Sequence, residues 1–514
     1  MFRAIWFGII FLFRIALSIY FMIFVRSYAA GVYQFFDMLS IIIVLVIIMR
    51  RKSNSFSIAW IVLILTLPVI GLLYYIIWGR TEALWNKNHP LVLSKERGFS
   101  YLKKDREVYL ALNAKYPDRK RLSGFLGRKG YPVYANTECK YFPSGELYFD
   151  ALLADINDAK KFIFLEYFIL SEGKIWDKIK KILIEKSKQG TDVRIIIDDF
   201  GSIITAPGKL LNELAVYNIK LARFHNVLKP STFLYYNNRN HRKIAVIDGY
   251  IGYTGGINIG DEYANIYEKH GYWKDTAVRM EGDAVWSLTV AFLQMWDYET
   301  RETTNYDLYR SCYAKDQHSG VSSRETPKTS HSGYFQPFTD GPSNTSDKIA
   351  RTVYKAAVHN AKKYVYITTP YLVVDDATVD ALRISVQSGN DIRIITPKKW
   401  DKWFVHMATQ SNYKELLEAG VRIYEYTPGF IHAKTLLSDD EYAVTGTINM
   451  DFRSFYLHFE NAVWICGSPV LEDFKKDMLD IIDKSEEITL ENWVKRPLFL
   501  KIAQNIFHLF EVLL

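Results

Sequence analysis

Cysteine is scarce in this chain of 514 residues, and its three cysteines, Cys139, Cys312 and Cys466, are scattered without a C-x-x-C pair. This pattern excludes a disulfide framework and a cysteine-ligated zinc site. The zinc-binding sequence H-E-x-x-H is absent as well. We therefore expect neither a metal nor an organic cofactor.

Acidic residues are also in deficit. Asp and Glu number 56 against 64 Lys and Arg, which gives a net charge of +8 at pH 7. A basic chain favours anionic partners, namely phosphates, nucleic acid or an anionic membrane surface. Since 49% of the residues are hydrophobic, the chain can bury a large core. Its length suits two or three domains.

Charge is nearly missing from three long stretches at the N-terminus. Residues 4–25 carry a single charge, and residues 38–49 and 58–78 carry none. A helix crosses a bilayer core in about 20 apolar residues. The stretch 58–78 meets this length, and lipid tolerates its Pro68. No small-residue cleavage site follows the first stretch, so a signal peptide is disfavoured. We expect residues 1–80 to be a membrane anchor of two or three helices.

The charges beside these stretches indicate two opposite orientations. The cluster RRK at 50–52 lies in a short loop. The positive-inside rule places that loop in the cytoplasm, which leaves the chain after residue 80 outside. The basic stretch 87–104 favours the reverse. Both orientations stay open.

Beyond residue 107 the sequence alternates between strand and helix patterns. Residues 162–170 and 192–198 have the composition of buried strands, and 175–188 has helical spacing. Together these predict an α/β sheet. Two similar strands return at 364–372 and 391–396, about two hundred residues later. An internal duplication accounts for the return.

The duplication predicts two tandem α/β-sheet halves related by a pseudo-two-fold axis, at 107–316 and 334–514. Residues 317–333 are polar and aperiodic, which is typical of a linker. The second half ends in an amphipathic helix at 498–514. That helix would lie either on the membrane or against the domain.

A histidine–lysine–aspartate motif occurs in both predicted halves. In the first half the spacing H-x-K-x4-D is formed by His241, Lys243 and Asp248. In the second half it is formed by His432, Lys434 and Asp439. Each motif is followed at the same distance by an asparagine at the end of a glycine-containing turn, Asn258 or Asn449. Two such aligned copies should occur by chance in on the order of one chain in a thousand or fewer.

These residue types define an anion site. Alternate residues of a strand share a face, so the histidine and the lysine of each motif project toward one spot. Packing of the halves about a pseudo-two-fold axis would bring two imidazoles, two ammonium groups and two carboxamides into one cleft. The lysines and asparagines would hold phosphate oxygens and stabilise developing charge. One histidine can attack phosphorus while the other protonates the leaving alcohol.

Each histidine also needs a carboxylate to fix its tautomer and stabilise the imidazolium. Asp275 follows the first motif, and Glu460 follows the second. The motif aspartates Asp248 and Asp439 belong to the candidate catalytic set. Their position at strand ends nevertheless favours a structural or ion-pairing role.

A histidine outside such a motif is more often a satisfied core residue than a ligand or catalyst. We expect this structural role for His225, His270, His406 and His458.

The twin motifs and their trailing turns resemble the phospholipase D superfamily. More narrowly, the chain is similar to bacterial cardiolipin synthases of that superfamily in the segments HRKIAVIDGYIGYTGGINIGDEY and GTINMDFRSFYLHFEN and in its apolar N-terminus. The resemblance implies two phospholipase D-like α/β-sheet halves behind transmembrane helices, in a multi-pass protein of the bacterial cell membrane. It implies that two phosphatidylglycerols give cardiolipin and glycerol through a phosphohistidine, without a metal. In many relatives the first histidine is the nucleophile, here His241, and the second the general acid, here His432. The partners implied are phosphatidylglycerol and the lipid bilayer, with no nucleic acid.

Other functions share the same motifs. A membrane-tethered phosphodiesterase or nuclease would add a basic groove interleaved with aromatics and a steep salt dependence. A phosphatidylserine synthase or a phospholipase D would differ only in the acceptor. A silent binding protein is disfavoured because both motifs are complete.

Overall fold

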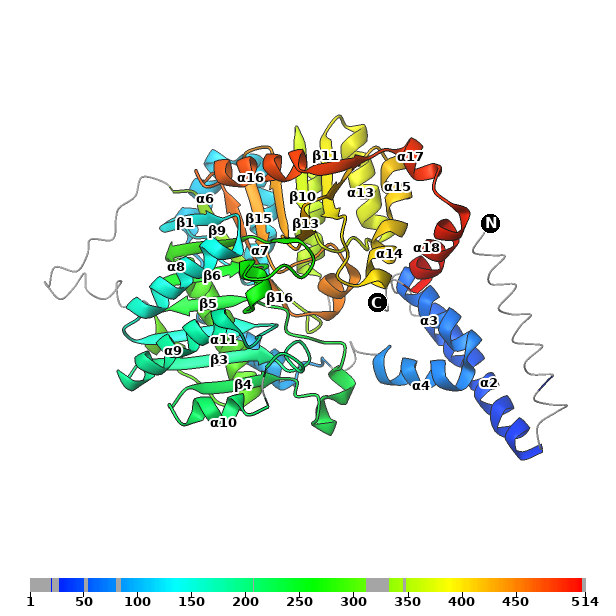
Figure 1. The fold of residues 1–514 in the computed structure, drawn as a ribbon, viewed down its shortest axis with the longest axis horizontal. Helices are drawn as coiled ribbons and strands as arrows, with labels where there is room; N and C mark the ends of the chain where they lie inside the picture. The colour runs from blue at the N-terminus through cyan, green and yellow to red at the C-terminus, as the bar shows by residue number, and fades with distance from the viewer. Residues whose placement is uncertain are drawn as a thin grey trace, which may run out of the picture.

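The computed structural model describes residues 20, 27–49, 54–79, 85–206, 208–310, 332–344 and 348–510. It shows two α/β halves side by side, with the N-terminal helices projecting from one end (Figure 1). The predicted linker at 317–333 lies outside the described residues except for its last two.

The first half is built on a seven-stranded mixed sheet with the order β1-β8-β6-β5-β2-β3-β4. Its strands are β1 (Thr137–Phe142), β2 (Phe162–Tyr167), β3 (Asp192–Asp198), β4 (Lys220–Phe224), β5 (Ile244–Ile247), β6 (Ile251–Gly255) and β8 (Ala277–Gly282). Strands β2, β3 and β4 are parallel, and the others pair antiparallel.

The second half repeats this order in an eight-stranded sheet, read as β9-β16-β15-β14-β10-β11-β12-β17. Its strands are β9 (Tyr334–Asp340), β10 (Tyr364–Thr368), β11 (Asp391–Pro397), β12 (Arg422–Tyr426), β14 (Thr435–Ser438), β15 (Tyr442–Gly446), β16 (Glu460–Cys466) and β17 (Ser485–Ile488). Each of the first seven has a counterpart in the first sheet, and β17 is an added edge strand. The predicted duplication of an α/β sheet is confirmed.

Helices cover both faces of each sheet, which is why the central strands are apolar throughout. The outer face of the first sheet packs against α8 (Gly145–Asp158), α9 (Lys174–Lys188) and α10 (Leu210–Ala215). The outer face of the second packs against α12 (Ile349–His359), α13 (Asp376–Gln387) and α15 (Tyr413–Glu418). Between the sheets, α11 (Val285–Thr300) and α16 (Leu471–Asp483) share one core that joins the halves.

The helices that precede β1 serve both halves. Helix α5 (Pro90–Phe99) packs on α11. Helices α6 (Arg106–Lys115) and α7 (Lys120–Arg128) add Leu112, Leu122 and Leu126 to the core of the second half, although they lie in the range predicted as the first.

The stretch 58–78, expected to be one membrane-crossing helix, is broken in the structure. It forms α3 (Asn54–Thr66) and α4 (Pro68–Trp78), and each is too short to cross a bilayer. The break follows from Pro68, because the residue before a proline is pushed out of the helical region. Leu67 accordingly has φ −129° and ψ 78°.

The second stretch, 38–49, belongs to a longer helix than expected, α2 (Ser27–Met49). Among the described residues, α2 alone is long and apolar enough to cross a membrane, over Gly31–Met49. Most of residues 4–25 lies outside the described part of the chain.

Both motif aspartates tie the end of their own strand to the start of its neighbour. The Asp248 carboxylate accepts hydrogen bonds from the backbone N–H groups of Lys160, Lys161 and Phe162 at 2.7–3.0 Å. Asp439 accepts equivalent bonds from Lys362, Lys363 and Tyr364 at 2.9–3.1 Å, and a further bond from Arg119 at 3.0 Å. Both aspartates have left-handed backbones, with φ of 53° and 58°. These contacts favour the structural role.

We expect Asp248→Ala to lower the free energy of unfolding by about 3 kcal/mol, since three backbone N–H groups, one of them at buried Phe162, lose their acceptor and alanine is strained at positive φ. Asp248→Asn keeps one acceptor oxygen and tolerates that backbone, so its loss should be less than half as large. Urea titration of detergent-solubilised protein measures both values. A variant that unfolds like the parent but has lost all activity would contradict this role.

Candidate active site

The two histidine–lysine pairs lie at the junction of the halves. His241 and Lys243 immediately precede β5, and His432 and Lys434 immediately precede β14, so each pair sits in extended chain just before its strand. The His241 N–H donates to the Phe459 carbonyl oxygen at 2.9 Å, and the His432 N–H donates to the Lys274 carbonyl at 2.7 Å. Each motif is therefore hydrogen-bonded to the opposite half.

A short parallel pair of strands supports one of these contacts. Strand β7 (Tyr272–Lys274) of the first half pairs with β13 (Gly429–Ile431), which leads directly into His432. On the other side, Asn240 and Phe459 form a single parallel bridge. The two related bridges hold both motifs at one site.

The carboxylates that orient the histidines come from the opposite halves. His241 Nδ1 lies 3.0 Å from both carboxylate oxygens of Glu460, and His432 Nδ1 lies 2.6 Å from Asp275 Oδ2. Both predicted partners are thus in place, but each serves the histidine of the other motif. With Nδ1 occupied, Nε2 is the ring nitrogen left for chemistry.

Burial favours the neutral form of both histidines. It lowers the pKa of His241 well below its usual value, and Lys243 acts in the same direction. Burial and then Lys434 lower the pKa of His432 to about 4, against the opposing effect of Asp275. The pKa of His241 is also lowered by His432, which shows that the two imidazoles lie within electrostatic range.

The two lysines carry positive charge into the same buried region. Lys243 Nζ donates to the His241 carbonyl oxygen at 2.7 Å, and Lys434 Nζ donates to the His432 carbonyl. Burial lowers the pKa of Lys243 to about 7 and that of Lys434 to about 8. An ammonium group that loses hydration to this extent gains strongly from an anionic partner.

The two asparagines are engaged differently. Asn258 Oδ1 accepts from the Ile169 N–H at 3.0 Å, and its Nδ2 donates to the Tyr263 hydroxyl at 2.9 Å. Asn449 Nδ2 donates to Asp451 at 3.2 Å, while its buried Oδ1 has no hydrogen-bond partner in the described part of the chain. Each side-chain nitrogen keeps a second hydrogen, the donor that a phosphate oxygen requires.

Sequence reasoning did not find two residues of the site. Thr447 donates its hydroxyl to Glu460, and its counterpart in the first motif is Gly256. A side chain at Gly256 would overlap Asp275, since a Cβ there would lie 2.0 Å from Asp275 Oδ1. The difference between the turns GGIN and GTIN was therefore the available signal.

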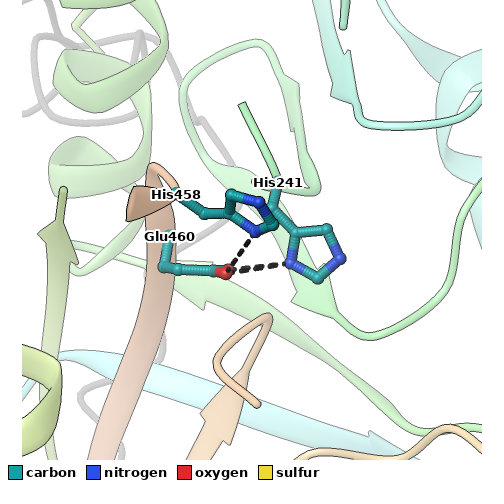
Figure 2. A group of neighbouring side chains, drawn as sticks. All are labelled: His241, His458 and Glu460. Carbon is teal, nitrogen blue, oxygen red and sulfur yellow. Dashed lines mark hydrogen bonds and ion pairs between the residues drawn. The ribbon is translucent and has the colours of Figure 1, made fainter. Parts of the chain in front are cut away.

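His458, expected to be structural, is the second such residue. It lies beside His241 and Glu460, and the potential ligand atoms of these three side chains are within 4.8 Å of one another (Figure 2). A cation there would have to replace the bond between His241 and Glu460. The geometry instead indicates a carboxylate shared between two imidazoles.

Comparison with known proteins agrees with this geometry. Residues 152–279 and 354–482 match the family model described as cardiolipin synthase, PLD-like domain. Residues 38–80 match the model described as phospholipase D-nuclease N-terminal. The two longer matches fall on the two halves.

Similar proteins cover nearly the whole chain. Cardiolipin synthase 2 of Bacillus anthracis is 34% identical over 472 residues, which span 91% of this chain and 89% of that protein. The cardiolipin synthase of Alkalihalophilus pseudofirmus is 31% identical over 496 residues, or 96% and 95% of the two chains. The crystal structure of phosphatidylserine synthase from Haemophilus influenzae shares the fold, with a TM-score of 0.57 at 17% identity over 77% of this chain and 100% of that one. The chain therefore belongs to the cardiolipin synthase family of phospholipase D-like proteins.

Proposed function

We propose that this protein is a membrane phosphatidyltransferase that converts two phosphatidylglycerols into cardiolipin and glycerol. One observation carries the proposal: a buried site at the junction of the halves contains two carboxylate-oriented histidines and two poorly solvated lysines. A phosphodiester supplies the missing negative charge. The similarity to cardiolipin synthases supports the choice of phosphatidylglycerol as both donor and acceptor.

In the first step a histidine Nε2 attacks the phosphorus of one phosphatidylglycerol. An N–P bond forms as the P–O bond to the headgroup glycerol breaks. The second histidine, which is protonated once the phosphodiester anion is bound beside it, gives that oxygen its Nε2 proton. The lysines and the asparagine amides stabilise the charge on the non-bridging oxygens. Glycerol leaves, and the phosphatidyl group stays on the enzyme.

In the second step the headgroup hydroxyl of another phosphatidylglycerol gives its proton to the second histidine. Its oxygen forms the new P–O bond as the N–P bond breaks. The product is cardiolipin, and both histidines return to their starting protonation states. Every proton in this cycle moves between a substrate oxygen and an imidazole.

The surroundings of the histidines support His241 as the nucleophile and His432 as the acid. Burial and Lys243 lower the pKa of His241 well below its usual value, which favours the neutral ring that a nucleophile needs. His432 has a closer carboxylate, 2.6 Å away, which favours the charged ring that an acid must carry.

The proposed location is the bacterial cell membrane, crossed more than once. Helix α2 provides one crossing. Residues 4–25 have the length and apolar composition that a second crossing requires. The short helices α3 and α4 then lie between the membrane and the catalytic halves.

The C-terminal helix α18 (Leu498–Phe510) has the character of a membrane-surface helix. Its polar Gln504 is buried and donates to Gln410 of α14 (Trp403–Ser411) at 3.1 Å. Its exposed residues include the apolar Leu498, Phe499, Ile502 and Ile506. Exposed apolar side chains along a surface helix match a lipid interface, and α18 also contacts α3.

Apolar side chains are also exposed at equivalent places in both halves, just after corresponding strands. Phe200 and Ile204 are exposed just after β3, and Trp400 and Trp403 are exposed just after β11. Tyr236 connects the first group to the anchor through ring contacts with Phe200 and with Trp78 of α4. We propose that this rim faces the bilayer. Water at about 55 M would compete for a phosphohistidine in an open site, so transfer requires a site that opens toward lipid.

Anion binding to the site should weaken as the pH rises. In the free enzyme Lys243 and Lys434 lose their protons near pH 7 and 8, so full affinity is expected below pH 7 and is lost above these values. Sulfate is a suitable probe because its charge is constant over this range. Calorimetry in buffers of different ionisation enthalpy should detect proton uptake on binding at pH 8. If the affinity for sulfate did not change between pH 6 and 9, the anion site would be contradicted.

The covalent intermediate should form on His241. A reaction with phosphate-labelled phosphatidylglycerol, quenched and digested, should give label on the peptide that contains His241, and His432→Ala should accumulate it. Label on His432 would reverse the two roles. No phosphoenzyme under any quench would rule out the two-step mechanism.

The product distinguishes a transferase from a hydrolase. Purified protein in phosphatidylglycerol vesicles, assayed with excess chelator, should release glycerol and form cardiolipin with little phosphatidic acid. Deletion of residues 1–79 should lower transfer more than phosphodiester cleavage. If the main product were phosphatidic acid, the protein would be a hydrolase. If it acted on nucleic acid alone, it would be a nuclease.

A further inference from the structure

His458 presents an unused polar atom to the catalytic carboxylate. Its Nδ1 lies 3.8 Å from Glu460 Oε1, and its ring centroid lies 5.6 Å from that of His241. Figure 2 shows both imidazoles directed at the same carboxylate. The His458 Nδ1 atom is buried and has no hydrogen-bond partner within the described ranges. The mechanism above gives this imidazole no role.

The backbone fixes this arrangement. His458 and Glu460 are two residues apart in extended chain at the start of β16, so their side chains project to the same side. Phe459 between them is part of the core that joins the halves. Its backbone N–H donates to Arg239 and its carbonyl accepts from His241. The segment that positions His241 therefore positions His458 as well.

The duplicated site has no second imidazole of this kind. Trp273 precedes Asp275 by two residues, as His458 precedes Glu460. Its ring centroid lies 5.3 Å from that of His432. An indole does not titrate and has a single fixed donor. The two catalytic pairs therefore differ at this position.

The charges around His458 keep it neutral. Burial lowers its pKa well below the usual value, and four cationic side chains act in the same direction: Arg453, Arg239, Lys243 and Lys402. A neutral imidazole has one N–H, which either ring nitrogen can carry. On Nδ1 it faces the carboxylate.

Glu460 is the group on which such a donor would act. Burial raises its pKa to about 8, and Asp451 acts in the same direction. Lys243 opposes this, together with hydrogen bonds from Thr447 and Ser454. The protonation of Glu460 is therefore balanced near pH 8.

That balance decides whether His241 can attack. A carboxylate accepts the proton of Nδ1 and leaves a lone pair on Nε2. A protonated Glu460 donates to Nδ1 and leaves hydrogen on Nε2, which is the wrong tautomer for a nucleophile. The reactive form of the site needs donors that favour the carboxylate.

We propose that His458 is a positioning residue that donates its Nδ1–H to Glu460, holds it as the carboxylate and thereby fixes the reactive tautomer of His241. The contact becomes a hydrogen bond if it closes by about 1 Å. This inference rests on the proposed function for the role of His241 as nucleophile. It also explains why the carboxylate shared by two rings belongs to the histidine that attacks.

The pH dependence of turnover tests the proposal. Loss of a donor raises the pKa of Glu460, so His458→Phe should move the acid limb of kcat/KM to higher pH by about one unit, a loss of about tenfold below that limb. His458→Asn places an amide N–H near the position of Nδ1 and should restore most of the profile. His359→Phe removes an exposed imidazole from the end of α12 and should change nothing. If His458→Phe does not yield folded protein, His458→Leu is used in its place.

The tautomer can also be read without turnover. The test uses ¹⁵N-histidine-labelled protein in vesicles at about pH 8.5, between the pKa of Glu460 in the parent and the value expected in the variant. The His241 signal, identified by its absence from His241→Ala, should show protonation on Nδ1 in the parent. In His458→Phe it should show protonation on Nε2 at the same pH. The role of His458 would be overturned if the His241 tautomer were the same in the parent and in His458→Phe, or if their pH profiles of kcat/KM were superimposed. An equal shift of the acid limb in His458→Phe and His458→Asn would overturn it as well. Failure of the parent protein to make cardiolipin while the tautomer still responds would count against the proposed function alone.

Discussion

The site depends on hydrogen bonds between histidine and carboxylate that cross from one half to the other. His241 of the first half is oriented by Glu460 of the second, and His432 by Asp275 of the first. Neither half contains a complete catalytic pair. The shared core between the sheets, and the backbone bonds from each motif to the opposite half, therefore serve the chemistry as directly as they serve stability. A shift of one sheet against the other would separate both pairs at once.

Much of this architecture was predictable because it is local or repeated. The buried strands, the duplication and the twin motifs follow from apolar runs and from spacing. The partners of the histidines were predictable as residue types, but their exchange between halves was not. Order along the chain associates Asp275 with the first motif and Glu460 with the second, and only tertiary packing reverses this. The place of His458 beside the site was missed because a single histidine is usually structural. It was not considered together with Glu460, which follows it by two residues.

The prediction of the membrane anchor failed for a different reason: the strong hydropathy of the sequence outweighed the effect of a single proline. The hydropathy of 58–78 favours one long helix, yet Pro68 removes a backbone donor and crowds Leu67. The structure follows the local constraint and makes two short helices. The break turns α4 toward the first half, where Trp78 contacts Tyr236 near the apolar rim. A continuous helix would lack that turn at Pro68.

Duplication alone gives two equivalent histidines, whereas phosphatidyl transfer needs a nucleophile and an acid. The two halves differ in the contacts around these histidines. Gly256 leaves room for the shorter Asp275, and Thr447 instead donates to the longer Glu460. Arg242, beside His241, is held by buried Glu166 at 2.6 Å, while the equivalent Ala433 packs in the core. The ion pair with Glu166 thus adds to the support of the His241 segment, and the pairing of β7 with β13 adds to the support of the His432 segment. A nucleophile must keep one ring face and one tautomer through two displacements at phosphorus, and the acid has only to exchange a proton. The proposed roles, with His241 as nucleophile and His432 as acid, therefore draw on differences that the two halves build around otherwise equivalent motifs.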